Sequence, residues 1–329
     1  MDTLETLTQQ IMDGHQVTRE EALWLSKQPL EHLCRQADRI RRHFCKNTFD
    51  LCTIINGKSG RCSENCKFCA QSTHNHTDAD TYPLLSKEEI LADAKKQAAQ
   101  GILRYSIVTA GKALSDEEID IMCGTIRQIR QETTLSVCVS FGLLTESQFR
   151  RLKDAGVSRV HNNLETSERH FPNICTTHTF ADKVSAIQAA QQAGLTVCSG
   201  GIMGMGETMA DRIDMALALR GLGITSVPVN VLNPIPGTPF GEYPTLSEEE
   251  VLRILALYRF LLPSAFIRMA GGRGLLPDGG KSCFLSGANA AITGDMLTTA
   301  GITVQTDLQM LTELGYEVKL DETTDDHRH

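Results

Sequence analysis

Three cysteines in one short segment are the first candidates for chemistry. Cys62, Cys66 and Cys69 have the spacing C-x3-C-x2-C within eight residues. Thiolates are soft ligands that favour zinc, copper(I) or iron–sulfur clusters. A closed structural zinc site takes four ligands, so His74 or His76 would have to complete one here. Three cysteines on a four-iron cluster would instead leave one iron open, so the spacing favours a cluster that binds and activates a small molecule.

The composition of the 329-residue chain argues against a disulfide scaffold, a membrane protein and a nucleic-acid binder. Its 11 cysteines make up about 3% of the residues, which is too sparse for a disulfide scaffold. No signal-peptide pattern and no membrane-spanning apolar run is recognised, so we expect a cytoplasmic protein in a reducing compartment. The formal net charge of −8 argues against a general nucleic-acid or anionic-membrane binder.

Short apolar segments alternate with longer amphipathic segments and predict the scaffold. The eight expected strands are 51–56, 103–108, 135–140, 158–163, 195–200, 226–231, 265–269 and 290–293. The helices expected between them are 87–99, 116–133, 146–155, 181–193, 209–222 and 247–261. This alternation predicts a parallel sheet in an α/β fold. Eight βα units over about 250 residues favour a closed (βα)8 TIM-type barrel, with a doubly wound open sheet as the alternative.

The barrel is expected to form one domain together with its flanking segments. These are an N-terminal helical segment over 1–45, the barrel over 46–318 and a polar tail over 319–329. Active sites of TIM barrels lie at the carboxyl ends of the strands. The three cysteines directly follow the first expected strand, which predicts that they lie at this face.

The segment 62–72 resembles the cluster motif of radical S-adenosylmethionine (SAM) enzymes, and residues 15 to 316 resemble the biotin synthases. Further matching segments are 197–202, 204–208, 227–230, 234–239, 267–268 and 283–289. The resemblance implies that Cys62, Cys66 and Cys69 hold a 4Fe-4S cluster, which binds SAM and, with one electron, cleaves it to a 5′-deoxyadenosyl radical. It also implies that this radical abstracts hydrogens from dethiobiotin, and that an auxiliary iron–sulfur cluster supplies the sulfur of biotin.

The expected ligands of the auxiliary cluster fall on alternate strands. Cys138, Cys198 and Arg268 lie on the third, fifth and seventh expected strands, and alternate strands fill one interior layer of a TIM barrel. A buried arginine needs an anionic partner, which a thiolate-ligated cluster would be. By resemblance, Arg268 is itself a cluster ligand. The chain departs from the family at Ser106, where the resemblance expects the first cysteine of the set.

Cys175 is our candidate for the missing ligand. It follows the fourth expected strand, at a position where the family usually has an apolar residue. With Cys138, Cys175, Cys198 and Arg268 as ligands, the auxiliary cluster would be of the 2Fe-2S or a four-iron type. The alternative is that Cys175 is incidental and the auxiliary cluster is absent or weak. The cysteines expected to be structural are Cys34, Cys45, Cys52 and Cys123.

Polar residues near the strand ends supply the other site candidates. By resemblance, Asn163 and Asn230 hold the ureido group of dethiobiotin, which suits an amide that both donates and accepts. Glu165 falls near the SAM ribose, where the family commonly has Asp. Lys183 is either a partner of the SAM carboxylate, in place of the commoner Arg, or a solvated helix residue. Glu207 either contacts SAM or caps the following helix.

These features favour sulfur insertion into dethiobiotin over two other functions. A related radical SAM enzyme, such as a hydrogenase maturase or an amino-acid mutase, would share the barrel and the cysteine motif. The interior cysteines, Arg268 and the paired asparagines fit the sulfur-inserting enzyme instead. The third possibility is a ferredoxin-like electron carrier or a zinc-binding adaptor. An electron carrier would need neither the long barrel nor a three-ligand cluster, and a brown, oxygen-sensitive protein that cleaves SAM on reduction would exclude zinc. The resemblance also implies a flavodoxin- or ferredoxin-like electron donor and a homodimer.

Overall fold

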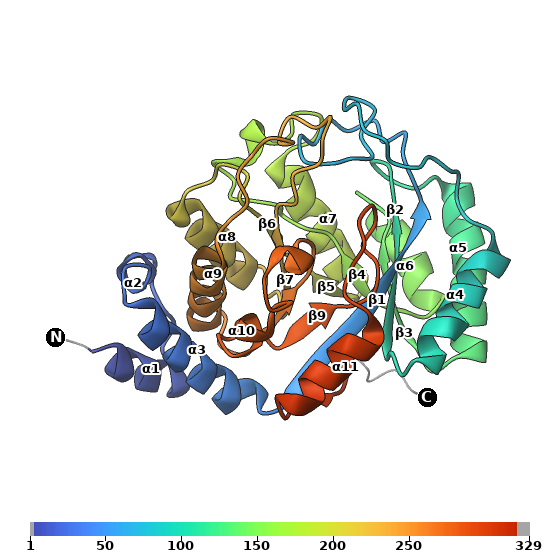
Figure 1. Cartoon of the computed structure of the whole chain (residues 1–329). Coiled ribbons are helices and arrows are strands. Elements are labelled where there is room, and N and C mark those ends of the chain that lie inside the picture. Colours follow the sequence, from blue (N-terminus) through green and yellow to red (C-terminus); the bar gives the residue numbers. More distant parts are fainter. Residues whose placement is uncertain (1–2, 321–329) are drawn as a thin grey trace.

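Parallel strands form a closed ring at the centre of the computed structural model, which describes residues 3–320 (Figure 1). In ring order the strands are β1 (Thr48–Lys58), β2 (Arg104–Thr109), β3 (Ser136–Ser140), β4 (Val157–His161), β5 (Thr196–Cys198), β7 (Ser226–Val231), β8 (Phe266–Met269) and β9 (Ala290–Ile292). The ring closes where β9 pairs with β1 in parallel. This arrangement confirms the predicted (βα)8 TIM-type barrel and excludes the open sheet.

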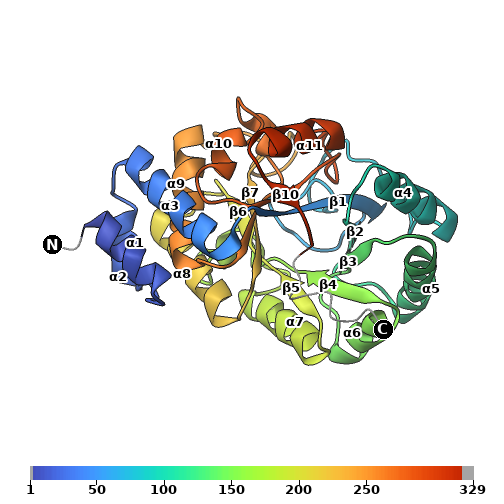
Figure 2. The same ribbon diagram turned by 90° about the horizontal axis from the view of Figure 1, so that it is seen from below.

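Helices alternate with the strands and cover the outside of the ring (Figure 2). They are α4 (Lys87–Ala99), α5 (Asp116–Glu132), α6 (Glu146–Asp154), α7 (Phe180–Gln192), α8 (Met209–Gly221), α9 (Glu248–Leu261), α10 (Lys281–Phe284) and α11 (Val304–Glu313). The helices from α4 to α9 all begin with a capping box, such as Ser86 with Glu89. Because these caps are local signals, the predicted helix starts agree with the structure to within one residue. Among the described residues, no helix is long and apolar enough to cross a bilayer.

Three N-terminal helices lie against one side of the barrel (Figures 1 and 2). They are α1 (Leu4–Met12), α2 (Arg19–Leu25) and α3 (Leu30–Cys45), and α3 packs on α9 while α2 packs on α8. At the other end of the chain, β10 (Glu317–Val318) pairs with the start of β1. The predicted polar tail, 319–329, lies outside the described residues except for its first two positions.

The fifth strand position is broken in two, which the sequence did not predict. After β5, the short strand β6 (Gly201–Met203) continues along β7. A Cβ at Gly200 would lie 1.9 Å from the carbonyl oxygen of Pro228, and one at Gly201 would lie 2.3 Å from that of Glu165. Only glycine permits this close approach of three backbone segments. The break brings the backbone of 200–201 next to residues expected to bind substrate and cofactor.

Side-chain alternation separates the apolar core from the barrel interior. On β2, Tyr105 and Ile107 are fully buried in the core between the strands and the helices. Their neighbours Arg104, Ser106 and Val108 instead line a cavity inside the ring. This period of two is the normal consequence of a pleated strand. The core that stabilises the barrel therefore lies outside the ring, which leaves the interior available for polar and sulfur-containing side chains.

Candidate active site

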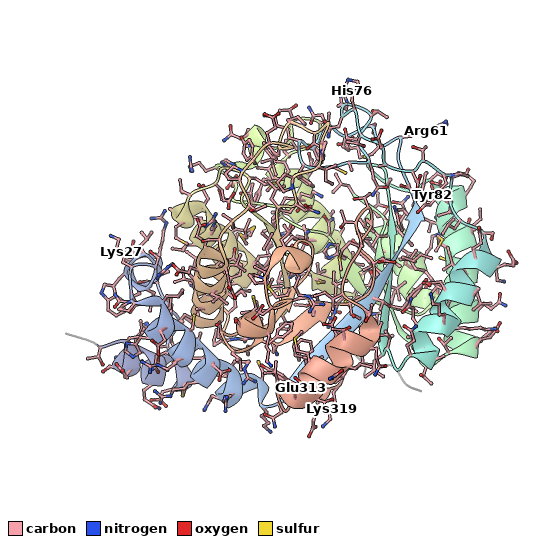
Figure 3. All side chains as sticks on the ribbon, viewed as in Figure 1. Lys27, Arg61, His76, Tyr82, Glu313 and Lys319 are labelled. Carbon is pink, nitrogen blue, oxygen red and sulfur yellow. The ribbon has the colours of Figure 1, made fainter. Side chains whose placement is uncertain are left out.

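A cavity of about 350 Å³ occupies the interior of the barrel. Its lining runs from Phe68 and Cys69, in the segment 62–69 that we call the cysteine loop, to Arg104 and Arg268 on the strands. Figure 3 shows Arg61 and His76, which flank the cysteine loop, at the opposite end of the barrel from Glu313 and Lys319. The loop follows the carboxyl end of β1, which is the face where a TIM barrel carries its active site.

The cysteine loop is folded back on itself by its own hydrogen bonds. The backbone N–H of Cys62 donates to the carbonyl of Gln71 at 3.0 Å. The side-chain amide of Asn75 donates to the carbonyls of Cys66 and Cys69 at 3.2 and 2.8 Å. Burial raises the pKa of Cys69 to about 11, and the neighbouring Cys62 and Glu165 act in the same direction. Since thiolates are the metal-binding form, loading a metal at this loop must release protons.

The loop suits a multi-iron cluster better than a single zinc ion. Among the described residues, the three ligand atoms that come within 4.8 Å of one another belong to Cys66, Cys175 and His178, not to the three motif cysteines. His74, a candidate fourth zinc ligand, has its Nε2 within 3.1 Å of the carbonyl oxygen of Ser63. The sulfur atoms of the three motif cysteines do not form such a compact set, which fits a cluster of several irons better than a single ion.

Cys175 lies beside the cysteine loop rather than with the interior cysteines. It follows η1 (Phe171–Asn173), and its Sγ accepts from the thiol of Cys66 at 3.7 Å. His178 Nδ1 lies 3.4 Å from the Cys175 sulfur and 2.6 Å from a carboxylate oxygen of Glu64. The structure therefore does not bring Cys175 to Cys138, where the sequence-based hypothesis placed it.

A buried cluster of charges closes the bottom of the cavity. The Asp50 carboxylate, fully buried on β1, lies 3.3 Å from Arg104, 3.3 Å from Arg159 and 3.2 Å from Arg268. Burial alone would raise the pKa of Asp50, but the three guanidinium groups hold it below its ordinary value. One carboxylate faces three arginines, so the cluster keeps an excess of positive charge.

Sulfur atoms lie directly above this charge cluster. Arg104 Nη1 donates to the Cys138 sulfur at 3.7 Å, and the Ser226 hydroxyl donates to the Cys198 sulfur at 3.3 Å. Arg268 Nη1 donates to the sulfur of Cys52 at 3.1 Å. The structure thus brings the predicted Cys138, Cys198 and Arg268 to one cavity, and adds Cys52 to them.

This interior fits an anionic, thiolate-ligated iron–sulfur cluster. Among the described residues, Arg104 Nη2 is buried without a hydrogen-bond partner. Buried cations without sufficient counter-charge are costly, so an anionic group in the cavity would stabilise them. The donor set of soft thiols also suits iron–sulfur chemistry.

The two predicted asparagines flank the break in the fifth strand. Asn163 Oδ1 accepts from the backbone N–H of Gly200 at 3.1 Å, and its amide group donates to Glu165 at 3.3 Å. Asn230 donates to the carbonyl of Gly201 at 3.0 Å and accepts from the N–H of Gly271 at 2.9 Å. Both side chains line the cavity, and these bonds orient them.

Glu165 and Lys183 lie between the asparagines and the cysteine loop. Glu165 lines the cavity with a left-handed backbone, φ 70°, which is uncommon for a non-glycine residue. Burial raises the pKa of Glu165, while the nearby Lys183 opposes this effect. Lys183 is half-buried, and its Nζ donates to Asn162 at 3.4 Å. The hydrogen bond with Cys175 and burial raise the pKa of Cys66, and the charge of Lys183 opposes this rise. The lysine is therefore close enough to the loop to attract an anionic group there.

Two family models match the chain, one after the other. The Radical SAM superfamily matches residues 28–219, and the Biotin and Thiamin Synthesis associated domain matches residues 228–317. A biotin synthase from Brachyspira hyodysenteriae is 58% identical over 97% of this chain and 96% of its own length. One from Akkermansia muciniphila is 57% identical over 97% of this chain and 100% of its own length. The chain belongs to the biotin synthase family. As a radical SAM protein of this family it uses a 4Fe-4S cluster and SAM.

More distant solved structures share the fold of this biotin synthase family member. A methylornithine synthase superimposes with a TM-score of 0.83 at 20% identity, covering 95% of this chain and 97% of its own. A maturase of the [FeFe]-hydrogenase has a TM-score of 0.83 at 17% identity, covering 98% of this chain and 76% of its own. At these identities the likeness concerns the barrel alone.

Glu207 supports a loop in this biotin synthase family member. Its carboxylate accepts from the backbone N–H groups of Gly204 and Met205 at 2.8 and 2.7 Å, and pairs with Arg212 at 2.7 Å. The following helix is capped by Thr208 instead. Of the two alternatives from the sequence, the helix cap is therefore wrong, and the carboxylate holds the loop that precedes α8.

Cys52 is the interior cysteine that sequence reasoning treated as structural. It is 6% exposed and lines the same cavity as Cys138 and Cys198. The rule that alternate strands share an interior layer, applied to strands three, five and seven, could have been extended to the first strand. There it would have selected Cys52.

Proposed function

We propose that the chain converts dethiobiotin to biotin. The single observation that carries the proposal is the shared cavity, which connects the cysteine loop at its mouth to Cys138 and Cys198 inside the barrel. When bound, the 4Fe-4S cluster and SAM supply a 5′-deoxyadenosyl radical, and an auxiliary iron–sulfur cluster supplies sulfur. One shared cavity lets radical, substrate and sulfur meet inside the barrel, where restricted access of water suppresses side reactions of a radical.

The two groups of cysteines have different tasks in this proposal. Cys62, Cys66 and Cys69 hold the 4Fe-4S cluster at the carboxyl face of the barrel. Cys138 and Cys198 hold the auxiliary cluster at the bottom of the cavity, where Arg268 is available as a further ligand. The excess positive charge around Asp50 supports an anionic cluster there rather than an apolar ligand.

The polar residues between the two groups bind the small molecules. Asn163 and Asn230 orient the ureido group of dethiobiotin, because each amide is already held by backbone hydrogen bonds. Lys183 attracts the SAM carboxylate, and Glu165 accepts from the ribose hydroxyls. Glu207 acts indirectly, since it shapes the loop at Gly204 and Met205.

The function also requires partners outside the chain. One electron must reach the 4Fe-4S cluster, for which we propose a flavodoxin- or ferredoxin-like donor. A reducing cytoplasm would keep the thiols available for cluster assembly. A homodimer remains our expectation for the assembly.

Anaerobic turnover tests the function. Protein reconstituted with iron and sulfide is given SAM, a chemical reductant and dethiobiotin, and biotin is quantified by mass spectrometry. We expect biotin and 5′-deoxyadenosine together. Cleavage of SAM without biotin would contradict the substrate and point to a maturase- or mutase-type reaction. No cleavage of SAM by protein with a full 4Fe-4S cluster would contradict the radical chemistry itself.

A further inference from the structure

We propose that Cys52 is a ligand of the auxiliary iron–sulfur cluster, in place of the thiol that Ser106 lacks. The role rests on the proposed function, because it requires that an auxiliary cluster be present. It also differs from the sequence-based hypothesis, in which Cys175 supplies the additional thiolate.

Strand register places Cys52 in one interior layer with the other cysteines. In a TIM barrel the four side chains of a layer come from alternate strands, and each step of two strands shifts the register by two residues. From Cys52 the register leads across β2 to Ser136, two residues before Cys138. From Cys138 it leads across β4 to Thr196, two residues before Cys198.

The same steps continue around the ring and return to the start. From Cys198 the register leads across β7 to Phe266, two residues before Arg268. From Arg268 it leads across β9 to Asp50, two residues before Cys52. Cys52 and Arg268 therefore complete a closed layer of four side chains with the two interior cysteines.

Direct contacts agree with this layer. The Cys52 sulfur accepts from Arg268 Nη1 at 3.1 Å, and the side chain is almost fully buried. Cys52 lines the same cavity as Cys138 and Cys198. A thiolate at Cys52 would also add negative charge beside the three arginines that face the single carboxylate of Asp50.

Ser106 and Cys175 are less suitable for this role. Ser106 lines the same cavity from β2, but its hydroxyl is a poorer iron ligand than a thiolate. Cys175 lies at the mouth of the barrel, with its sulfur 3.7 Å from that of Cys66. Cys52 is thus the thiol that geometry adds to Cys138 and Cys198.

Iron content of reconstituted variants tests this role without relying on turnover. The full chain is reconstituted anaerobically as wild type and as Cys52→Ala, Cys138→Ala, Cys175→Ala and Cys123→Ala. Iron and acid-labile sulfide are counted per chain, and Mössbauer spectra separate the two clusters. Cys123 is the matched control, because it is buried in the outer core and its thiol donates to the carbonyl of Arg151.

We expect Cys52→Ala to lose the auxiliary signal and to keep only the iron of the 4Fe-4S cluster, as Cys138→Ala does. Cys123→Ala and Cys175→Ala should keep both signals. Far-UV circular dichroism of Cys52→Ala at the wild-type level would show that the barrel is intact, and its remaining 4Fe-4S signal would show that the first cluster is intact. Cys52→Ser, which preserves the volume, provides a second variant and should show the same loss if alanine prevents folding.

If Cys52→Ala keeps all the iron of the auxiliary cluster and its Mössbauer spectrum is unchanged, Cys52 is not a ligand of that cluster. The same conclusion follows if Cys175→Ala is the only variant that loses this iron. Wild-type protein that reconstitutes with one cluster only would also overturn the role of Cys52. The proposed function fails in a different way, namely if wild-type protein holds both clusters and cleaves SAM but forms no biotin. That result would leave the assignment of Cys52 intact, since it concerns iron content rather than product.

Discussion

Asp50 carries the negative charge that faces three arginines inside the barrel. Replacing it by Asn would leave three buried guanidinium groups without their carboxylate, and removing one partner of a buried ion pair typically costs about 3 to 5 kcal/mol. We expect Asp50→Asn to lower the free energy of unfolding of the iron-free protein by that amount, measured by urea denaturation. Asp214→Asn, which breaks the more exposed pair with Arg19, should cost less than about 1 kcal/mol. Equal effects of the two substitutions would contradict the charge cluster.

The buried ring of His161 makes the stability of the folded protein depend on pH. Burial lowers its pKa from 6.5 to about 4, so the folded protein resists protonation of this ring. The unfolded chain takes up the proton below about pH 6.5, so stability is full above that pH and falls as the pH drops toward 4. His161→Asn should reduce this loss by up to about 3 kcal/mol in urea titrations between pH 7 and 4. The exposed His76→Asn is the control, and an identical pH profile for both variants would contradict burial as the cause.

The structure brings together the predicted residues to which a strand rule applied. Cys138, Cys198 and Arg268 share a cavity because their strands alternate around the ring. Cys175 could not be placed in this way, because it lies in a loop after β4. Its position depends on tertiary contacts such as the hydrogen bond between Lys67 N–H and the carbonyl of Ile174. Such contacts leave no local pattern in the sequence.

At the scale of elements, the break between β5 and β6 depends on a residue without a side chain. A Cβ at Gly200 would meet the backbone of Pro228 at 1.9 Å, and a backbone atom cannot move aside as a side chain can. We expect Gly200→Ala to destabilise the protein by on the order of 3 kcal/mol and to weaken dethiobiotin binding, because Asn163 bonds to this backbone. Urea denaturation and binding of dethiobiotin to the reconstituted protein measure the two effects.

Gly124 provides the matched control for this substitution. It lies inside α5, where a Cβ would meet no heavy atom within 4 Å apart from the backbone of its own helix and its chain neighbours. Gly124→Ala should raise stability by about 0.5–1 kcal/mol, because alanine has the better helix propensity. Similar losses from both substitutions would show that close packing at the strand break is not the reason.

The helices and strands themselves were predictable because their signals are local. Capping residues mark the helix starts, and alternating apolar runs mark the strands. The split of the expected strand 195–200 was missed, since the two glycines only reveal their role once Pro228 and Glu165 are brought against them. The strand breaks because of these contacts in the folded protein, not because of the strand propensity of the local sequence.

At the scale of the whole molecule, the apolar core and the reactive interior lie on opposite sides of the strands. Tyr105 and Ile107 are buried against the helices, whereas Arg104 and Ser106 of the same strand line the cavity. Folding of the barrel therefore depends on the outer core, and the interior can carry charges that an apolar core would exclude.

Removal of iron distinguishes the contribution of the outer core to stability from that of the clusters in the interior. We expect protein treated with a chelator and a reductant to keep its far-UV circular dichroism, because the outer core is untouched. Its melting temperature should fall by roughly 5–10 °C, because ligands that bind only the folded state stabilise it and the arginines around Asp50 lose an anionic partner. Reconstitution with iron and sulfide should restore the melting temperature, which controls for damage by the treatment. Loss of the circular dichroism signal on iron removal would show instead that the clusters, rather than the outer core, hold the barrel together.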